Sequence, residues 1–472
     1  AIAQTSARHP RGPNASTRRS SSLAIGVDAP TMANLRTLVL LGSALLLALP
    51  ATAQGTTYYV SAAKGKGKKG TKDEPVRDLS VIAPNLKNGD TVLIAGGTYT
   101  GRADCGSDQI KVTCKILGGW NDEFTARDPW GAHRTILSGD NKTKNWNFNA
   151  RLWFDCRGQK EPGAIVVDGL VVDNGARNYY QKDEGLKILR KANPSTGNNA
   201  TPESPGIFVD TPKGGTALIT NCIVMNTAPT GGTGAIYAFG HQDATLEIRN
   251  NLVINNTGSA IDCVSCWHPK DGKGIPRFTV ADNSVLFSWK YDPYATHGGS
   301  ALKMDGDTIV AATGNVFAFN DYFGVDNVKQ SKNLTLKDNL FGPSLVGDYQ
   351  EFSTVLTLAQ TEESAQLLSS DSSGNVAGKV ELQLDPKWSA SFAARSVIDR
   401  NKAEADVKAK DGWQNDVRSM LGLALQGTDV KADSDVWLHR MTIDDAVKAG
   451  LQKIGGKYGC QNPATGEAAP GK

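Results

Sequence analysis

The segment EIRNNLVINN, residues 247–256, recurs along the chain as a polar corner between short apolar strands. Its other copies are LITNCIVMN (218–226), VADNSVLFSW (280–289), AATGNVFAFN (311–320) and LKDNLFGPS (336–344). The copies align on Asn221, Asn251, Asn283, Asn315 and Asn339, in steps of 30, 32, 32 and 24 residues. Asparagine tolerates the left-handed backbone conformation, and stacked amides can hydrogen-bond to one another. We therefore expect these residues to form one column of corners.

A second piece recurs between the corners. Its copies are GIFVD (206–210), GAIYAF (234–239), SAIDCV (259–264), SALKMD (300–305) and FGVDN (323–327). No segment of this region has the 3.6-residue period of a helix. A repeat of about 30 residues built from short strands cannot bury its own apolar side, whereas stacked coils can. The pattern predicts an all-β solenoid over residues 54–345.

Alternation within the second piece predicts which side chains face the core. Two inward columns are expected: Ile207, Ile236, Ile261, Leu302 and Val325, and Val209, Ala238, Cys263, Met304 and Asn327. The outward column between them contains Phe208, Tyr237, Asp262, Lys303 and Asp326. Rungs of a parallel sheet lie about 4.8 Å apart, so Lys303 should stand between two carboxylates.

The two ends of the chain differ from the repeats. Residues 1–31 are polar and rich in Arg and Ser, and we expect them to be translated upstream sequence or a disordered leader. Met32 to Ala53 has the layout of a signal peptide with cleavage before Gln54. We expect a secreted or cell-surface protein without a stable membrane span. Residues 78–101 suggest a cap over the open end of the solenoid. Residues 346–472 are expected to form a mixed, partly helical cap or accessory region, with a helix over TIDDAVKAG (442–450).

Charge argues against a nucleic-acid partner. Residues 1–53 carry five of the 51 Lys and Arg residues and one of the 48 Asp and Glu residues, so the remainder is close to neutral. The lysines between residues 64 and 72 alternate with glycine and are expected to be a solvated loop. We expect a monomer.

The pair Cys263 and Cys266 forms a C-x-x-C motif. A zinc site would need further ligands nearby, and a redox motif would need a strand-to-helix junction. A core cysteine beside a turn cysteine, or a local disulfide, is the favoured interpretation.

Three N-terminal stretches, together with the asparagine corners, resemble a known protein family. TTYYVSAAKGKG (56–67), PVRDLSVIAPNLKNGDTVLIAGGTYTG (75–101) and ILGGWNDEFTARDPWGAHRTILSG (116–139), followed by the asparagine corners, resemble bacterial secreted right-handed parallel β-helix proteins of the pectate-lyase-like superfamily. The resemblance implies that fold and a role on an extracellular, acidic polysaccharide. The superfamily includes lyases, hydrolases, epimerases and adhesins, and none of its catalytic motifs is complete here.

Two hypotheses compete for the outward column. In one, Lys303 is a rung of an alternating charge ladder on a carbohydrate-binding or adhesin-like protein. In the other, Asp262, Asp305 and Asp326 hold Ca²⁺ while Lys303 removes a proton from a uronate, as in a polysaccharide lyase. A lysine base needs a lowered pKa, which carboxylates oppose unless a cation masks them.

Loops on either side of this rung add aromatic and titratable residues. His297 and Tyr291 are the other candidates for proton transfer, because imidazole and phenol groups can move protons. Aromatic rings stack on sugars. The residues expected to contact the sugar are Trp289, Tyr237, Trp267, Tyr294 and Tyr291.

Overall fold

The computed structural model describes residues 55–103, 106–139, 150–176, 186–188, 205–227, 233–289, 298–328, 333–351, 354–363, 368–382, 384–390, 392, 436–438, 440–450 and 457–466. Residues Ala53–Lys472 form one compact unit. The predicted leader and signal peptide, residues 1–53, lie outside the described residues.

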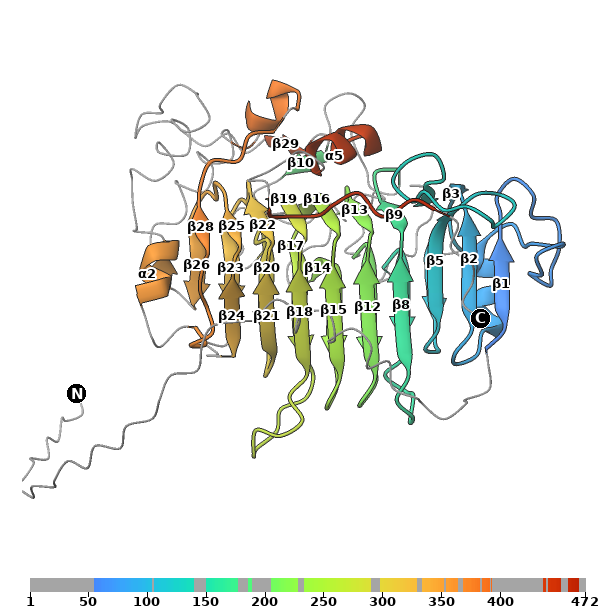
Figure 1. Cartoon of the computed structure of the whole chain (residues 1–472), viewed down its shortest axis with the longest axis horizontal. Helices are drawn as coiled ribbons and strands as arrows, with labels where there is room; N and C mark the ends of the chain where they lie inside the picture. The colour runs from blue at the N-terminus through green and yellow to red at the C-terminus, as the bar shows by residue number, and fades with distance from the viewer. Residues whose placement is uncertain are drawn as a thin grey trace, which may run out of the picture. The chain divides into compact units, whose positions relative to one another are not determined.

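Three sheets run along the molecule (Figure 1). Sheet A contains, in spatial order, β1 (Thr57–Val60), β2 (Thr91–Ala95), β5 (Lys115–Trp120), β8 (Ala164–Asp168), β12 (Thr216–Thr220), β15 (Thr245–Arg249), β18 (Arg277–Ala281), β21 (Ile309–Thr313) and β24 (Leu334–Lys337). Sheet B contains β3 (Gly97–Tyr99), β6 (Thr135–Leu137), β9 (Leu170–Asp173), β13 (Ile223–Met225), β16 (Leu252–Thr257), β19 (Ser284–Trp289), β22 (Val316–Ala318), β25 (Leu340–Phe341) and β28 (Val376–Ala377). Sheet C contains β4 (Asp108–Ile110), β7 (Leu152–Asp155), β11 (Ile207–Thr211), β14 (Gly234–Gly240), β17 (Ser259–Ser265), β20 (Leu302–Asp305), β23 (Phe323–Asn327), β26 (Gly347–Glu351) and β27 (Thr354–Leu356).

Strand pairing shows a right-handed parallel β-helix, as predicted. From β2 onward each coil gives one strand to sheet A, one to sheet B and one to sheet C. Neighbouring coils pair in parallel, for example β14 with β17 and β17 with β20. Among the described strands of the three sheets, one pair is antiparallel, β26 with β27 at one end of sheet C. The resemblance to pectate-lyase-like β-helix proteins is therefore confirmed at the level of fold.

The predicted inward columns are confirmed by the register of sheet C. Ile207 pairs with Ile236, Ile236 with Ile261, Ile261 with Leu302, and Leu302 with Val325. These side chains are fully buried in the main core that runs along the solenoid axis. Removal of this apolar surface from water is the largest favourable contribution to the stacking of the coils.

An amide ladder stabilises one corner between sheets A and B. Asn251, Asn283, Asn315, Asn339 and Asn375 form it, and each Nδ2 of the first four donates to the Oδ1 of the next at 2.9–3.0 Å. Each Nδ2 also donates to a backbone carbonyl of the previous coil, as Asn283 does to Ile248. Identical rungs thus satisfy one another inside the protein.

The expected place of Asn221 in this ladder is wrong by one residue. Cys222 occupies the rung, because its backbone N–H donates to Asn251 Oδ1 at 2.9 Å. Asn221 belongs to the neighbouring column, where Asn250 Nδ2 donates to Asn221 Oδ1 at 2.7 Å. That column, not the ladder, has the left-handed backbone: φ is 53° at Asn221, 51° at Asn250 and 55° at Asp282. The first corner residue therefore adopts the positive φ, and the residue after it forms the amide ladder.

The ends of the solenoid are covered. At the N-terminal end, α1 (Leu79–Ile82) and the 3₁₀ turn η1 (Ala83–Asn85) place Leu79 and Ile82 in the main core. Near the C-terminal end lies α2 (Leu358–Glu363), which contacts β26 and β27. Parallel pairing continues to β28, past the predicted solenoid limit at residue 345.

The C-terminal region packs on the outer face of sheet B, where Figure 1 shows α5 above the strands. The predicted helix over residues 442–450 is confirmed as α5 (Ile443–Gly450), with Asp445 N donating to Thr442 Oγ1. Ala446 and Ala449 join a second apolar cluster with Leu252 and Trp289. A short antiparallel pair, β10 (Leu186–Ile188) with β29 (Val436–Leu438), joins two distant parts of the chain. None of the described helices has the length and apolar character needed to cross a membrane.

Candidate functional site

The outer face of sheet C gathers aromatic, charged and nucleophilic side chains. Alternation along the strands decides this, because Ile236 and Ala238 point into the core while Tyr237 and Phe239 stay half-buried on the other side. The predicted outward column is present in the predicted order and extends in both directions. Register gives Gln109, Trp153, Phe208, Tyr237, Asp262, Lys303, Asp326 and Gln350.

Asp262, Lys303 and Asp326 form a charged column that is buried. Their exposed fractions are 0%, 4% and 1%. Lys303 Nζ lies 3.2 Å from Asp262 Oδ2 and donates a hydrogen bond to it. A lysine that removes a proton from a uronate is expected to be open to the substrate. The burial of Lys303 corrects that expectation, since no substrate proton can approach an amine with this little exposure.

Electrostatics also oppose Lys303 as a base. Burial by itself lowers the pKa of Lys303, but the charges of Asp262, Asp305 and Asp326 outweigh it and raise that pKa above its usual value. Burial raises the pKa of Asp262 to about 6, although the charge of Lys303 opposes the shift. At neutral pH the lysine is protonated and Asp262 is ionised, so the two form a buried ion pair.

The three aspartates do not converge on a common point that suits Ca²⁺. The ammonium of Lys303 lies beside them, 3.7 Å from Asp305 Oδ2 as well as close to Asp262. Asp305 is half-buried, and its Oδ1 accepts a hydrogen bond from Gly306 N. In the described part of the chain, no group of three or more His, Cys, Asp or Glu residues is arranged to hold a metal ion. A protonated lysine among the oxygen donors does not fit a calcium site, so we derive no step through the metal.

The outward column continues from Asp262 as an aromatic strip, which consists of Trp153, Phe208 and Tyr237 in the column and Phe239 next to it on β14. The rings of Trp153 and Phe208 are stacked, with centroids 5.8 Å apart and planes 7° apart. Phe208 and Tyr237 follow at 4.9 Å, and Tyr237 and Phe239 at 5.8 Å. All four are half-buried. The guanidinium of Arg157 lies 6.0 Å from the centre of the Trp153 ring, at the edge of the strip.

A thiol cluster of Asp210, His241 and Cys266 adjoins this strip. His241 Nε2 lies 2.7 Å from Asp210 Oδ1, and Cys266 Sγ lies 3.0 Å from His241 Nδ1. Consecutive coils bring them together, because Asp210 is on β11, His241 follows β14 and Cys266 follows β17. The sequence indicates Cys266 only as a turn cysteine, and it gives no sign that Cys266 meets His241 and Asp210. The thiol cluster could have been found from the strand register, which places the ends of β11, β14 and β17 side by side.

Cys263 and Cys266 are not joined by a disulfide. Cys263 is buried in the main core, and Cys266 is exposed in the following turn. The interpretation as a core cysteine and a turn cysteine is confirmed, and the alternative of a local disulfide is wrong.

Trp289 is not available to a sugar. It lies on β19 of sheet B, is fully buried, and donates from Nε1 to Asn255 Oδ1 at 2.8 Å. The prediction that Trp289 contacts the sugar is wrong, because Phe392 of the C-terminal region packs against its ring. Trp267 is 36% exposed, and its Nε1 donates to Lys273 O. Tyr291, Tyr294 and His297 lie outside the described residues.

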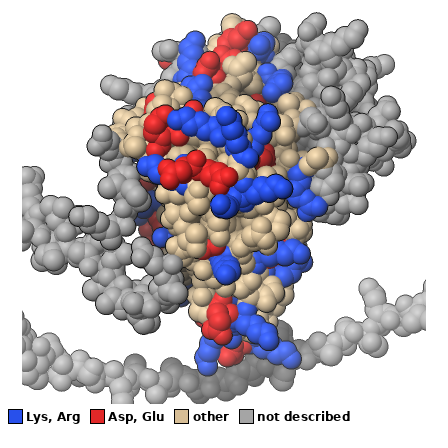
Figure 2. Space-filling view, turned by 90° about the vertical axis from the view of Figure 1, so that its right-hand side faces the viewer, with Lys and Arg blue, Asp and Glu red and all other residues tan. Residues whose placement is uncertain are grey.

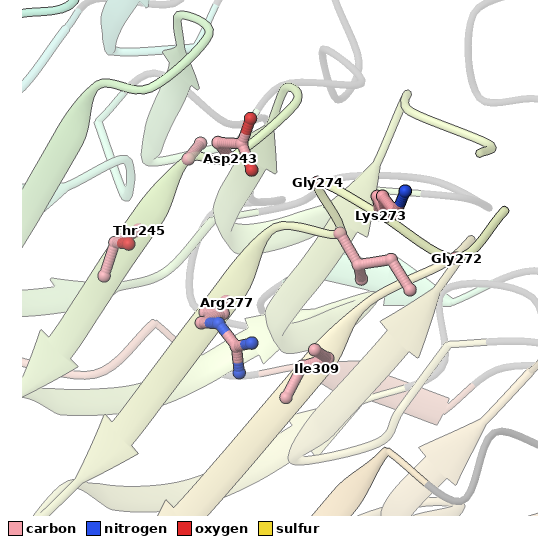
Figure 3. Close-up of a pocket in the computed structure, with 9 residues that line it drawn as sticks. Asp243, Thr245, Gly272, Lys273, Gly274, Arg277 and Ile309 are labelled. Atoms are coloured by element: carbon pink, nitrogen blue, oxygen red, sulfur yellow. The ribbon is translucent and has the colours of Figure 1, made fainter.

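A separate surface pocket of about 290 Å³ lies on sheet A. Its wall includes Asp243, Thr245, Lys273, Arg277 and Ile309. Figure 3 shows Lys273 in the loop beside the strands that carry Thr245, Arg277 and Ile309. These three strands belong to sheet A, so the pocket is not part of the sheet C face.

Surface charge is mixed at the β1 end of the solenoid. Figure 2 shows Lys and Arg interspersed with Asp and Glu there. Two of the lysines in residues 64–72 form ion pairs, Lys64 with Glu123 and Lys69 with Glu74. This end therefore does not present the uniformly basic surface that phosphate backbones bind.

Comparisons with known proteins give only remote likenesses. No protein-family model matches the chain, and no curated protein matches it. Among solved structures, pectate lyase Pel9A is 12% identical with a TM-score of 0.32, over 66% of this chain and 74% of that chain. A complex of XylC with xylose is 11% identical with a TM-score of 0.30, over 62% of this chain and 63% of that chain. A rhamnogalacturonan lyase is 10% identical with a TM-score of 0.27, over 62% of this chain and 74% of that chain. Such values support no conclusion about activity, and the fold rests on the three sheets themselves.

Proposed function

We propose that this is an extracellular polysaccharide-binding β-helix protein whose aromatic strip holds the sugar chain. The observation that supports this most is the strip itself: four aromatic side chains, half-buried rather than fully covered, on one face of a rigid sheet. Rings left partly open to water cost free energy unless they bind something, and sugar rings stack on such surfaces. The predicted signal peptide supports placement outside the cell.

The charges around the strip favour a neutral polysaccharide over the acidic one first expected. Among the described residues of this face, five aspartates stand against two cations, Arg157 and Lys303; the aspartates are Asp155, Asp210, Asp262, Asp305 and Asp326. Arg157 is already paired with Asp155 and Asp210, at 2.8 and 3.4 Å. A uronate chain would meet net repulsion here, whereas hydroxyl groups can bond to carboxylates without a charge penalty.

Binding is favoured over a lyase reaction. A lyase needs a base next to the uronate, and Lys303 is buried and held protonated by its carboxylate neighbours. An adhesin-like protein would bind sugar through the same strip without catalysing a reaction, so the proposal includes that role.

Isothermal titration of the purified chain with soluble neutral and acidic polysaccharides tests the proposal. We expect xylan, galactan or glucomannan to bind, and Trp153→Ala or Phe208→Ala to weaken binding at least about fivefold, since each stacked ring contributes about 1 kcal/mol or more. Val81→Ala, which trims an exposed apolar side chain on α1, is the matched control and should bind as wild type does.

Two outcomes would contradict the proposal. One is unchanged binding in both strip variants while circular dichroism shows them folded. The other is the appearance of unsaturated products, followed by ultraviolet absorbance, from pectate or alginate, which would restore the lyase hypothesis.

A further inference from the structure

We propose that Cys266, His241 and Asp210 form a nucleophile, a general base and an orienting carboxylate that hydrolyse ester groups. The choice of acylated sugar hydroxyls as the natural substrate rests on the proposed function. The chemical assignment of the thiol cluster rests on its own geometry.

That geometry is the arrangement required for an activated nucleophile. The thiol lies within hydrogen-bond reach of one imidazole nitrogen, Nδ1 at 3.0 Å, and the carboxylate lies 2.7 Å from the other, Nε2. Asp210 is only 3% exposed, and its second oxygen lies 3.4 Å from Arg157 Nε. A buried carboxylate that accepts from Nε2–H selects the tautomer with a free electron pair on Nδ1. The Sγ–H group can then donate to Nδ1.

Access to solvent separates Cys266 from the other described cysteines. Cys114, Cys156, Cys222, Cys263 and Cys460 are buried, and Cys266 alone among the described cysteines is exposed. Partial burial, with the charge of Asp210, raises the pKa of Cys266. Its resting form is therefore the thiol, and attack needs a neighbouring base to take the proton.

The position of the thiol suits a substrate held on the aromatic strip. The ring of Phe239, the last member of the strip, lies 6.1 Å from the ring of His241. A sugar stacked on the strip would thus present its substituents to Cys266. A side chain that only filled a turn would not need a base and a carboxylate aligned behind it.

The reaction balances without a cofactor. As Sγ attacks the carbonyl carbon, its proton moves to His241 Nδ1, and the carbonyl oxygen becomes an oxyanion. The oxyanion collapses, the ester C–O bond breaks, and the sugar oxygen leaves with the proton from His241. Water then attacks the thioester and gives its proton to Nδ1. Collapse releases the carboxylic acid, and Sγ recovers the proton, so ester and water become alcohol and acid.

Stopped-flow hydrolysis of p-nitrophenyl acetate by the purified chain tests this assignment. We expect a burst of p-nitrophenolate that approaches one equivalent per chain, and a peptide with one acetyl group on Cys266 in the mass spectrum. Cys266→Ala should abolish the burst. His241→Gln should slow it roughly 10²-fold or more, because the general base is lost, and Asp210→Asn should slow it less.

A matched control is available in a second His–Asp pair. His268 Nδ1 lies 3.0 Å from Asp307 Oδ2 in an exposed pair outside the thiol cluster. His268→Gln should leave the burst unchanged. Circular dichroism checks folding of each variant, and iodoacetamide labelling of Cys266 gives a second readout, slower in His241→Gln than in wild type.

A burst that persists in Cys266→Ala, or Cys266 labelling that is equally fast in His241→Gln, would overturn the proposal. Failure of the proposed function has a different signature. If the chain shows the burst but binds no polysaccharide, the nucleophile stands and the acyl substrate is another ester. If it binds polysaccharide but gives no burst and releases no acetate from O-acetylated xylan, this inference is wrong and the binding function stands.

Discussion

Two polar columns cross the coils of this protein, and they are built on opposite principles. The amide ladder, Asn251 to Asn375, repeats one neutral side chain that is both donor and acceptor. The charged column, Asp262–Lys303–Asp326, alternates side chains that are acceptor only and donor only. Every member of the ladder can satisfy the next at any pH. The charged column depends on the alternation of sign, and its contribution to stability therefore changes with the protonation state of its members.

The difference in burial sharpens this comparison. Asn251, Asn283, Asn315 and Asn339 are fully buried within a corner, and the charged column is nearly as deeply buried on an outward strand position. Asp262 Oδ1 has no hydrogen-bond partner among the described residues. A buried charge with an incomplete set of partners costs more than an amide in a complete ladder. We therefore expect the charged column to be the more fragile of the two.

Replacement of the central cation should cause the largest loss. In Lys303→Met, Asp262 and Asp326 face a neutral side chain while buried, so the free energy of unfolding should fall by about 3–5 kcal/mol. Urea unfolding at pH 7, followed by circular dichroism, measures it.

Lys64→Met is the control, because it makes the same substitution in an exposed ion pair with Glu123 and should leave the unfolding midpoint nearly unchanged. Addition of Asp262→Asn to Lys303→Met should recover part of the loss. A midpoint for Lys303→Met equal to that of the Lys64 variant would show that the charges of the column are not coupled.

Interruption of the amide ladder should cost less. Asn283→Ala removes the acceptor of Asn251 N and Nδ2 and the donor to Ile248 O and Asn315 Oδ1. Buried groups left without partners should lower the free energy of unfolding by about 2–3 kcal/mol in the same urea experiment.

The adjacent residue provides the control. Asp282 has φ 55°, and Gly314 occupies the same position one coil later with φ 68°. Asp282→Gly should keep or slightly raise stability, since glycine adopts this conformation without strain. If the two variants lose equal stability, the corner geometry and not the ladder is what matters.

The smallest of these effects is a dependence on pH. Burial raises the pKa of Asp262 to about 6 in the folded protein, above its ordinary value of 3.8. The folded state therefore binds this proton more tightly, and the contribution of Asp262 to stability falls as pH rises from about 4 to 6. The stability of wild type relative to Asp262→Asn should be about 2 kcal/mol greater at pH 4 than at pH 7. A difference that stays constant between these pH values would contradict the raised pKa.

The solenoid was predictable from local pattern because its repeats are short and its core faces alternate. Residues such as Ile236 and Ile261 recur with the same neighbours, so their stacking followed from alignment alone. The one-residue error at Asn221 has a physical source. Both residues of the corner are asparagine in the next coil, Asn250 and Asn251, and sequence does not tell which amide turns inward.

For the candidate site, the sequence predicts only the order of the residues along the outward column. Register placed Lys303 between Asp262 and Asp326, as expected. Its exposure was not predictable, because alternation says which side of a strand a residue faces and not whether something covers that side. Trp289 shows the same limit, since it is covered by a part of the chain about a hundred residues away.

Repetition within the chain was enough to define a stack of parallel coils, because each coil buries its apolar side only against the next. The assembly of Cys266, His241 and Asp210 depended on tertiary structure. These residues are separated by 25 and 31 positions and meet because successive coils end at the same edge of sheet C. Contacts of that kind depend on the length of each coil and on the direction of the side chains at the strand ends. Both are determined only when the chain is folded.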